Sequence, residues 1–218
     1  MNKLWVFGDS FSATSKRRDV EHWRMEYAKW KGYNPDVWPE FLNKNLNLKL
    51  KNLAISGTDN YTIFDTIIDN IDKIEANDIV IIGWTSTLRF RLVSTNNNFN
   101  TIRPNEDLKS STLNIPSLKY NNISLNTINE VLVNRDTKLY EWELNRFIKI
   151  INISLKDIKI LHWSPFQRQH PHLNIKKIEG IDALETISIE TNKELNDYHY
   201  SENGHLELSK KIYTMLYE

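Results

Sequence analysis

A serine follows a glycine turn directly after the first apolar run of the sequence. The run from Leu4 to Phe7 is typical of a strand buried on both faces, and Gly8-Asp9-Ser10 comes immediately after it. Open α/β sheets bind their ligands at the carboxyl ends of their strands. Gly8 permits a sharp turn there, which would expose the Ser10 hydroxyl beside backbone N–H groups that can stabilise an oxyanion. The pattern therefore predicts a nucleophilic serine, with Asp9 supporting the turn.

An acid and a histidine late in the sequence supply the partners that a serine nucleophile needs. A serine hydroxyl requires a base, usually a histidine, which an acid holds in one tautomer. Asn196-Asp197-Tyr198-His199 precedes the last predicted helix. Residues two apart in an extended segment point to the same side, so Asp197 can orient the His199 ring. We predict Ser10, His199 and Asp197 as the catalytic residues. A Ser-His dyad is the alternative if a backbone carbonyl orients the ring.

The remaining histidines do not predict a metal centre. His162, His170 and His172 lie at or beyond the fourth predicted strand, without a cluster of Asp, Glu and His at ligand spacing. His205 falls in the first turn of the last predicted helix, where the helix dipole disfavours a charged imidazole, so we predict packing or a hydrogen bond for it. The first strand is not followed by a glycine-rich phosphate loop. We predict neither a metal nor a cofactor.

The elements that must position these residues form an alternation of short strands and amphipathic helices. We predict strands at residues 4–7, 50–55, 79–83 and 158–162, and a weaker fifth from Thr186 to Ile189. Apolar residues at helical spacing predict helices over 35–46, 61–74 and 138–155, and a last one from the N-cap Ser201 toward Leu216. This order is typical of an α/β domain with a mainly parallel sheet, and we expect one domain over residues 1–218.

Two segments interrupt this alternation. Residues 11–34 stand between the first strand and its helix and are rich in aromatic and charged side chains. Residues 93–135 are rich in Asn, Ser and Thr and show no sustained period. Long connections of this kind are usually lids or binding loops, so we predict both segments as insertions in the domain.

Composition excludes several classes of protein. Lys and Arg total 28 and balance 28 Asp and Glu, so no net field attracts nucleic acid or an anionic membrane. The absence of cysteine excludes disulfides and cysteine nucleophiles. No stretch approaches the ~20 apolar residues of a membrane span, and Met1-Asn2-Lys3 leads into a strand without an export signal. We predict a soluble protein, cytoplasmic or virus-encoded, that acts on a small or carbohydrate substrate.

Three blocks of the sequence resemble the SGNH (GDSL-like) hydrolase family. Gly8-Asp9-Ser10 matches the first block, and the run from Asp197 to His205 is similar to the last. Ala54-Ile55-Ser56-Gly57 is similar to the block that supplies the oxyanion-hole glycine. The resemblance implies a flavodoxin-like three-layer α/β/α sandwich with a mainly parallel sheet of about five strands. It also implies that the backbone N–H groups of Ser10 and Gly57 form part of an oxyanion hole.

The sequence departs from the family pattern in its third and last blocks. The family's third block is Gly-x-Asn-Asp, whereas Gly83-Trp84-Thr85-Ser86 stands here. Thr85 takes the place of the asparagine that donates to the oxyanion, and Ser86 is the fallback donor. In the last block the acid normally precedes the histidine by three positions, where this sequence has Asn196. We therefore prefer Asp197 as the residue that orients His199.

The resemblance implies a serine hydrolase that cleaves a short acyl ester through an acyl-enzyme, with O-acetyl groups on a carbohydrate as a candidate substrate. The fold would place Trp84 and Arg89 beside the active edge, so we predict that both contact the substrate. The altered third and last blocks motivate an alternative, which is a catalytically weak or inactive SGNH-like binding or structural module.

Overall fold

A sheet of four parallel strands forms the centre of the protein. The computed structural model describes residues 2–14, 22–87, 89–93, 99–102 and 136–218. The strand order is β2-β1-β3-β6, and every neighbouring pair is parallel. The strands are β1 (Lys3–Phe7), β2 (Lys49–Asn52), β3 (Ile79–Gly83) and β6 (Lys159–Trp163). Their carboxyl ends share one edge, as the sequence predicts.

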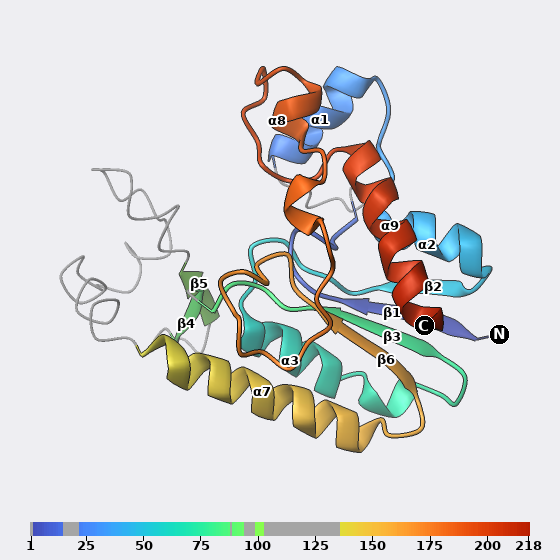
Figure 1. Ribbon diagram of the computed structural model, residues 1–218, viewed down its shortest axis with the longest axis vertical. Helices are drawn as coiled ribbons and strands as arrows, with labels where there is room; N and C mark the ends of the chain where they lie inside the picture. The colour runs from blue at the N-terminus through green and yellow to red at the C-terminus, as the bar shows by residue number, and fades with distance from the viewer. Residues whose placement is uncertain (1, 15–21, 88, 94–98, 103–135) are drawn as a thin grey trace.

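Alternate side chains of the strands enter two separate cores. Leu4 and Val6 pack on one face of the sheet, and Trp5 and Phe7 pack on the other, because successive strand side chains point to opposite faces. The helices α2 (Trp38–Leu46) and α9 (Glu202–Tyr217) cover the first face, and α3 (Asn60–Ile68) and α7 (Thr137–Ser154) cover the second. Figure 1 shows this three-layer α/β/α arrangement, which confirms the predicted fold class.

Side-chain caps mark the starts of two of these helices. The carboxylate of Asp59 accepts from Thr62 N at 2.8 Å and begins α3. Asp136 caps α7 in the same way. The helix predicted over 61–74 is shorter in the structure, because α3 ends early and only the 3₁₀ turn η1 (Ile71–Lys73) follows. Among the described residues, no helix is long and apolar enough to cross a membrane.

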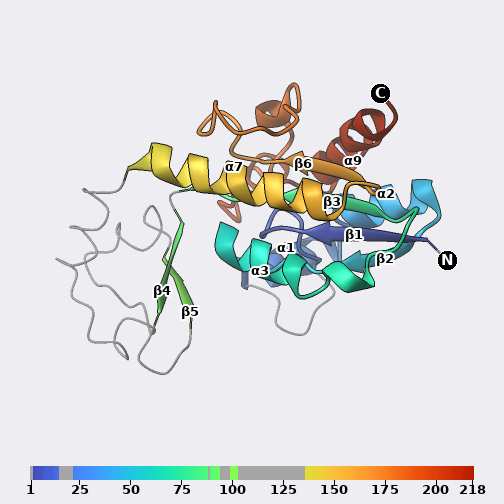
Figure 2. The same ribbon diagram turned by 90° about the horizontal axis from the view of Figure 1, so that it is seen from below.

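Both predicted insertions contain regular structure. The first includes α1 (His22–Lys31). The second includes β5 (Phe99–Ile102), which pairs antiparallel with β4 (Phe90–Val93) at the predicted start of the insertion. Figures 1 and 2 show this hairpin beside the start of α7, apart from the main sheet. Residues 103–135, the rest of the second insertion, lie outside the described residues.

The prediction of a fifth strand from Thr186 to Ile189 is wrong. These residues begin the short helix α8 (Ile187–Glu190), and Thr186 caps it with its side chain. The Thr-Ile-Ser-Ile run fits a strand, but the threonine cap favours a helical turn instead. Only a single antiparallel bridge, between Thr186 and Tyr200, retains strand character. The 3₁₀ turn η2 (Ile181–Ala183) precedes α8.

A buried carboxylate closes the other end of the sheet. Asp78 precedes β3 and accepts hydrogen bonds from Lys3 N at 2.7 Å, Trp5 Nε1 at 2.8 Å and Glu75 N at 3.1 Å. Burial alone would raise the pKa of Asp78, but the hydrogen bonds from Trp5 and the two backbone N–H groups outweigh it and lower the pKa. Asp78 is therefore an ionised anchor for β1.

Asp78→Asn should lower the free energy of unfolding at neutral pH by about 1–3 kcal/mol, because the amide leaves buried donors unpaired. The lowered pKa means that the contribution of the carboxylate is complete above the ordinary aspartate pKa of about 3.9 and is lost as the pH falls through the lowered value. Denaturant unfolding of both proteins across this pH range should show the difference shrinking in acid. Asp72→Asn, at an exposed aspartate in η1, is the matched control.

Candidate active site

Ser10 lies in a tight turn at the carboxyl end of β1. The backbone N–H groups of Ser12 and Ala13 both donate to Asp9 O at 3.0 Å and so close the turn around Ser10. Gly8 precedes the turn, as the sequence predicts. Ser10 is buried, with 3% of its surface exposed, so only a small part of the residue reaches the surface.

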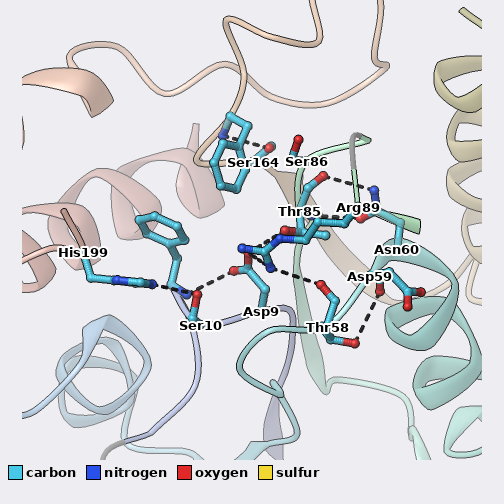
Figure 3. A network of polar contacts seen from close by, with 12 residues as sticks. Asp9, Ser10, Thr58, Asp59, Asn60, Thr85, Ser86, Arg89, Ser164 and His199 are labelled. Atoms are coloured by element: carbon cyan, nitrogen blue, oxygen red, sulfur yellow. Dashed lines mark hydrogen bonds and ion pairs between the residues drawn. The ribbon is translucent and has the colours of Figure 1, made fainter. Parts of the chain in front are cut away.

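His199 hydrogen-bonds to Ser10 on one side and to Asp197 on the other. Its Nε2 lies 2.8 Å from Ser10 Oγ, and its Nδ1 lies 2.8 Å from Asp197 Oδ1. The same carboxylate oxygen accepts from the backbone N–H of His199 at 2.8 Å. Asn196 is exposed and has a φ of 42°. The structure therefore places Asp197, and not Asn196, beside the ring. Figure 3 shows the contact between His199 and Ser10.

The electrostatics of this pair favour an ionised Asp197. Burial raises the pKa of its carboxyl group, but the hydrogen bonds and charge of His199, together with the charge of Arg24, lower it below its ordinary value. An ionised Asp197 accepts a hydrogen bond from Nδ1–H, so the proton stays on Nδ1. Nε2 is then the nitrogen that can accept the proton of Ser10.

Backbone hydrogen bonds fix the segment that carries His199. Ile187 N donates to His199 O, and Ser188 N donates to Asp197 O, both at 2.8 Å. Ser201 then begins α9 by accepting from Gly204 N at 3.1 Å. A Cβ atom on Gly204 would lie 2.1 Å from a backbone carbonyl oxygen of the preceding segment, so this close approach requires glycine. The predicted cap at Ser201 is confirmed.

An aromatic side chain packs directly against the His199 ring. The ring centroids of Phe11 and His199 are 4.8 Å apart, and Phe11 also contacts Tyr200 and Phe166 with centroid distances of 5.1 and 5.5 Å. Phe11 follows Ser10 in the sequence, so the turn that presents Ser10 also supplies a wall for the His199 ring.

Gly57 comes to the same edge of the sheet as Ser10. Beyond the last residue of β2, Leu53 N still donates to Val6 O at 2.8 Å and Ile55 N donates to Gly8 O at 2.9 Å. Gly57 follows two positions later with a φ of 74°, in the left-handed region that favours glycine. The backbone pairing therefore carries the Gly57 segment alongside the turn of the nucleophile.

The two side chains predicted as further oxyanion donors have other partners. Thr85 is fully buried, and its Oγ1 donates to Asp9 Oδ2 at 2.6 Å. Asn60 pairs with the Thr85 backbone, accepting from Thr85 N at 2.9 Å and donating to Thr85 O at 3.0 Å. Ser86 Oγ donates to Gln169 Oε1 at 3.3 Å. Figure 3 shows Thr85 beside Asp9. Oxyanion stabilisation by Thr85 or Ser86 remains a prediction.

Trp84 does not reach the site, which corrects its predicted role in substrate contact. It is fully buried in the core between the sheet, α3 and α7. Its Nε1 donates to His162 Nδ1 at 3.1 Å, and the two rings stack. The residue directly after a strand can point into either face, and here the alternation of β3 directs Trp84 into the core.

Arg89 joins the two turns that flank the site. Its Nη1 lies 3.3 Å from Asp9 Oδ2, next to Ser10, and donates to Thr58 O at 3.1 Å, next to Gly57. Figure 3 shows the guanidinium between these two partners. The sequence correctly placed Arg89 near the active edge, and 10% of its side chain is exposed. Substrate contact remains a prediction.

Three histidines, His162, His170 and His205, are buried in the fold. His162 bonds to Asn152 Oδ1 at 3.0 Å, and His170 contacts the backbone and hydroxyl of Thr87 at 3.2 Å. Burial lowers the pKa of His162 and of His170 to about 4, and lowers the pKa of His205 well below its ordinary value. In the part of the chain that the structure describes, no group of three or more His, Cys, Asp or Glu residues is placed to hold a metal ion.

Sequence reasoning missed two residues that touch the site. Phe11 packs on His199, and Arg24 donates from α1 to the backbone carbonyl of Ser10. The spacing of Arg24, Tyr27 and Lys31 places them on one face of a helix, which was an available signal that this face packs on the protein. It does not reveal which residues that face would meet.

A Ser, His and Asp that are hydrogen-bonded in series at the carboxyl edge of an α/β/α sheet form the arrangement of hydrolases that use a serine nucleophile. The model of the family described as GDSL-like Lipase/Acylhydrolase matches residues 4–212. The chain therefore belongs to this family, as the sequence blocks indicate, and the family's activity is the hydrolysis of acyl esters.

Solved structures of two G-D-S-L family proteins resemble the chain. One is from Desulfitobacterium hafniense DCB-2, with 12% identity and a TM-score of 0.37, covering 97% of this chain and 98% of the other. The second is from Veillonella parvula DSM 2008, with 12% identity and a TM-score of 0.37, covering 98% and 97%. Among curated proteins, none matches the sequence.

Thr85→Val tests whether the Thr85 hydroxyl acts in the site or in the scaffold. Because the hydroxyl donates to Asp9, we expect kcat on a short ester to fall less than about tenfold, whereas loss of an oxyanion donor costs about 10²–10³. The free energy of unfolding should fall by about 1 kcal/mol. Thr85→Ser keeps the hydroxyl and is the control. A loss of kcat in the 10²–10³ range in folded Thr85→Val would restore Thr85 as an oxyanion donor.

Proposed function

We propose that the protein is a serine esterase in which Ser10, His199 and Asp197 act together. The observation that carries the proposal is the placement of the His199 ring, which lies 2.8 Å from Ser10 Oγ on one side and 2.8 Å from Asp197 Oδ1 on the other. Membership of an acylhydrolase family supports the same reaction class.

The chemistry proceeds in two halves. His199 Nε2 accepts the proton of Ser10 Oγ as this oxygen attacks the ester carbonyl carbon. The backbone N–H groups of Ser10 and Gly57 stabilise the oxyanion, and protonated His199 then gives its proton to the departing alcohol oxygen. A water molecule, deprotonated by His199, attacks the acyl-enzyme, releases the carboxylic acid and regenerates Ser10. Asp197 stabilises the positive charge of His199 in both halves.

The surroundings of Ser10 favour a short acyl group on a polar alcohol. Ser10 is 3% exposed, and the Phe11 ring packs on its partner His199, which together restrict the size of the group that can approach Ser10. Arg89 supplies a cation at the same edge, where it can bind hydroxyl or other polar oxygens. O-acetyl groups on a carbohydrate combine these two properties and are the substrate class that we propose.

Ser10→Ala should reduce hydrolysis of p-nitrophenyl acetate by roughly 10⁴–10⁶-fold, as removal of a serine nucleophile does elsewhere. A fluorophosphonate probe should label the wild-type protein at Ser10, identified by peptide mass spectrometry, and should leave the variant unlabelled. A folded wild-type protein that neither turns over the ester nor reacts with the probe would overturn the esterase and support a non-catalytic module.

Asp197→Asn should lower kcat by roughly 10³–10⁴-fold, because an amide can hold the wrong tautomer of His199. Asn196→Ala is the matched control, since Asn196 is exposed next to Asp197 and should leave kcat essentially unchanged. The same kinetic assay checks both variants. Equal losses would indicate that disturbance of the loop, and not the carboxylate, explains the effect.

Acetate release from O-acetylated xylo-oligosaccharides tests the substrate class. We expect release that depends on Ser10, and a preference for acetyl over octanoyl in the p-nitrophenyl ester series. Turnover of p-nitrophenyl octanoate that exceeds that of the acetate, without release from the sugars, would contradict this substrate and leave the esterase mechanism standing.

A further inference from the structure

Arg24 places a buried cation against the backbone of the nucleophile. It lies in α1, within the first insertion, and is 4% exposed. Its Nη2 donates to the carbonyl oxygen of Ser10. A buried guanidinium is costly unless it is well paired, so a fixed arrangement of its partners is needed to keep it there.

This contact completes the fixation of the peptide group between Ser10 and Phe11. Arg24 holds the carbonyl oxygen of that peptide, and Asp9 Oδ1 accepts from Phe11 N at 3.0 Å. A peptide group bound on both edges cannot rotate without breaking a charge-assisted hydrogen bond. The backbone that carries Oγ toward His199 is therefore set from two sides.

The same helix is tied to the segment that carries His199. Lys31 Nζ donates to Glu190 in α8 at 2.7 Å, and the Tyr27 hydroxyl donates to the same carboxylate. Tyr27 also accepts from Glu202 N, at the start of α9, at 2.9 Å. Since α8 and α9 bracket Asp197 and His199, α1 joins the nucleophile turn to the loop of its base. Figure 1 shows α1 lying against α8.

The charge of Arg24 also reaches the Asp197–His199 pair. Burial raises the pKa of Asp197. His199 has the larger opposing effect, and the charge of Arg24 lowers the pKa further. The other titratable groups around Arg24 line a small cavity with it: Tyr27, Asp36, Tyr200 and His205. Burial, followed by the charge of Arg24, keeps His205 uncharged at neutral pH by lowering its pKa.

We propose that Arg24 is a positioning residue, which holds the Ser10–Phe11 peptide so that Ser10 Oγ meets His199 Nε2. The proposal rests on the esterase function above. It makes the first insertion part of the catalytic apparatus and gives α1 a role besides covering the protein. Arg24 acts through Ser10 and need not touch the substrate.

Arg24→Lys and Arg24→Gln separate geometry from charge. Lysine keeps the charge without the planar fork, and glutamine removes the charge. We expect kcat on p-nitrophenyl acetate to fall in both, by up to about 10²-fold, since a shift of about 1 Å at a reacting group costs that much. KM should change little, both variants should keep a cooperative folding transition, and the rate of fluorophosphonate labelling at Ser10 should fall in parallel with kcat.

The pH profile gives a readout that a purely structural role would not move. The charge of Arg24 lowers the pKa of Asp197, so its loss makes protonation of that carboxylate easier, and the acid limb of kcat/KM should move to higher pH in Arg24→Gln. Arg24→Lys should keep the wild-type limb. Arg146→Gln is the matched control, because Arg146 is exposed on α7, over the Trp142 ring, and should leave activity unchanged.

Two results would overturn the role of Arg24. One is wild-type kcat in either folded variant, and the other is loss of the folding transition in both variants, which would assign Arg24 to the stability of the fold. These results differ from failure of the esterase function, in which the wild-type protein itself shows no turnover and no labelling of Ser10.

Discussion

The buried carboxylate of Asp9 is the interaction on which the site depends. It is 1% exposed and accepts from Phe11 N at 3.0 Å and Thr85 Oγ1 at 2.6 Å, while Arg89 lies 3.3 Å away. A carboxylate withdrawn from water is unfavourable unless such partners are present together. The nucleophile turn, the end of β3 and the segment after it must therefore fold onto one another before any of them is satisfied. The geometry of the site is a consequence of this requirement.

Local patterns were enough to predict the four strands of the sheet and, with the family resemblance, to nominate Ser10, His199 and Asp197. The strands are short apolar runs because both faces of the sheet are covered, and Gly8 and Ser201 mark a turn and a cap through their own chemistry. Asp197 could be preferred over Asn196 because residues two positions apart in an extended segment point to the same side, and Asp197 stands two positions before His199. Each of these inferences needs only residues that are neighbours in the sequence.

Contacts between distant segments account for what the sequence did not reveal. Thr85 occupies the expected position, but the direction of its hydroxyl depends on Asp9, 76 positions earlier. Trp84 was expected at the surface of the site and is buried against His162, and Arg24 meets Ser10 through a helix in a predicted insertion. No spacing rule encodes these partners.

The hydrogen bond between Ser10 and His199 spans 189 positions of the sequence. Ribosomes add about 5–20 residues per second, so His199 leaves the ribosome about 10–40 s after Ser10. In the proposed mechanism, Ser10 therefore lacks its proton acceptor until the loop before α9 has been made and has docked beside the turn that follows β1.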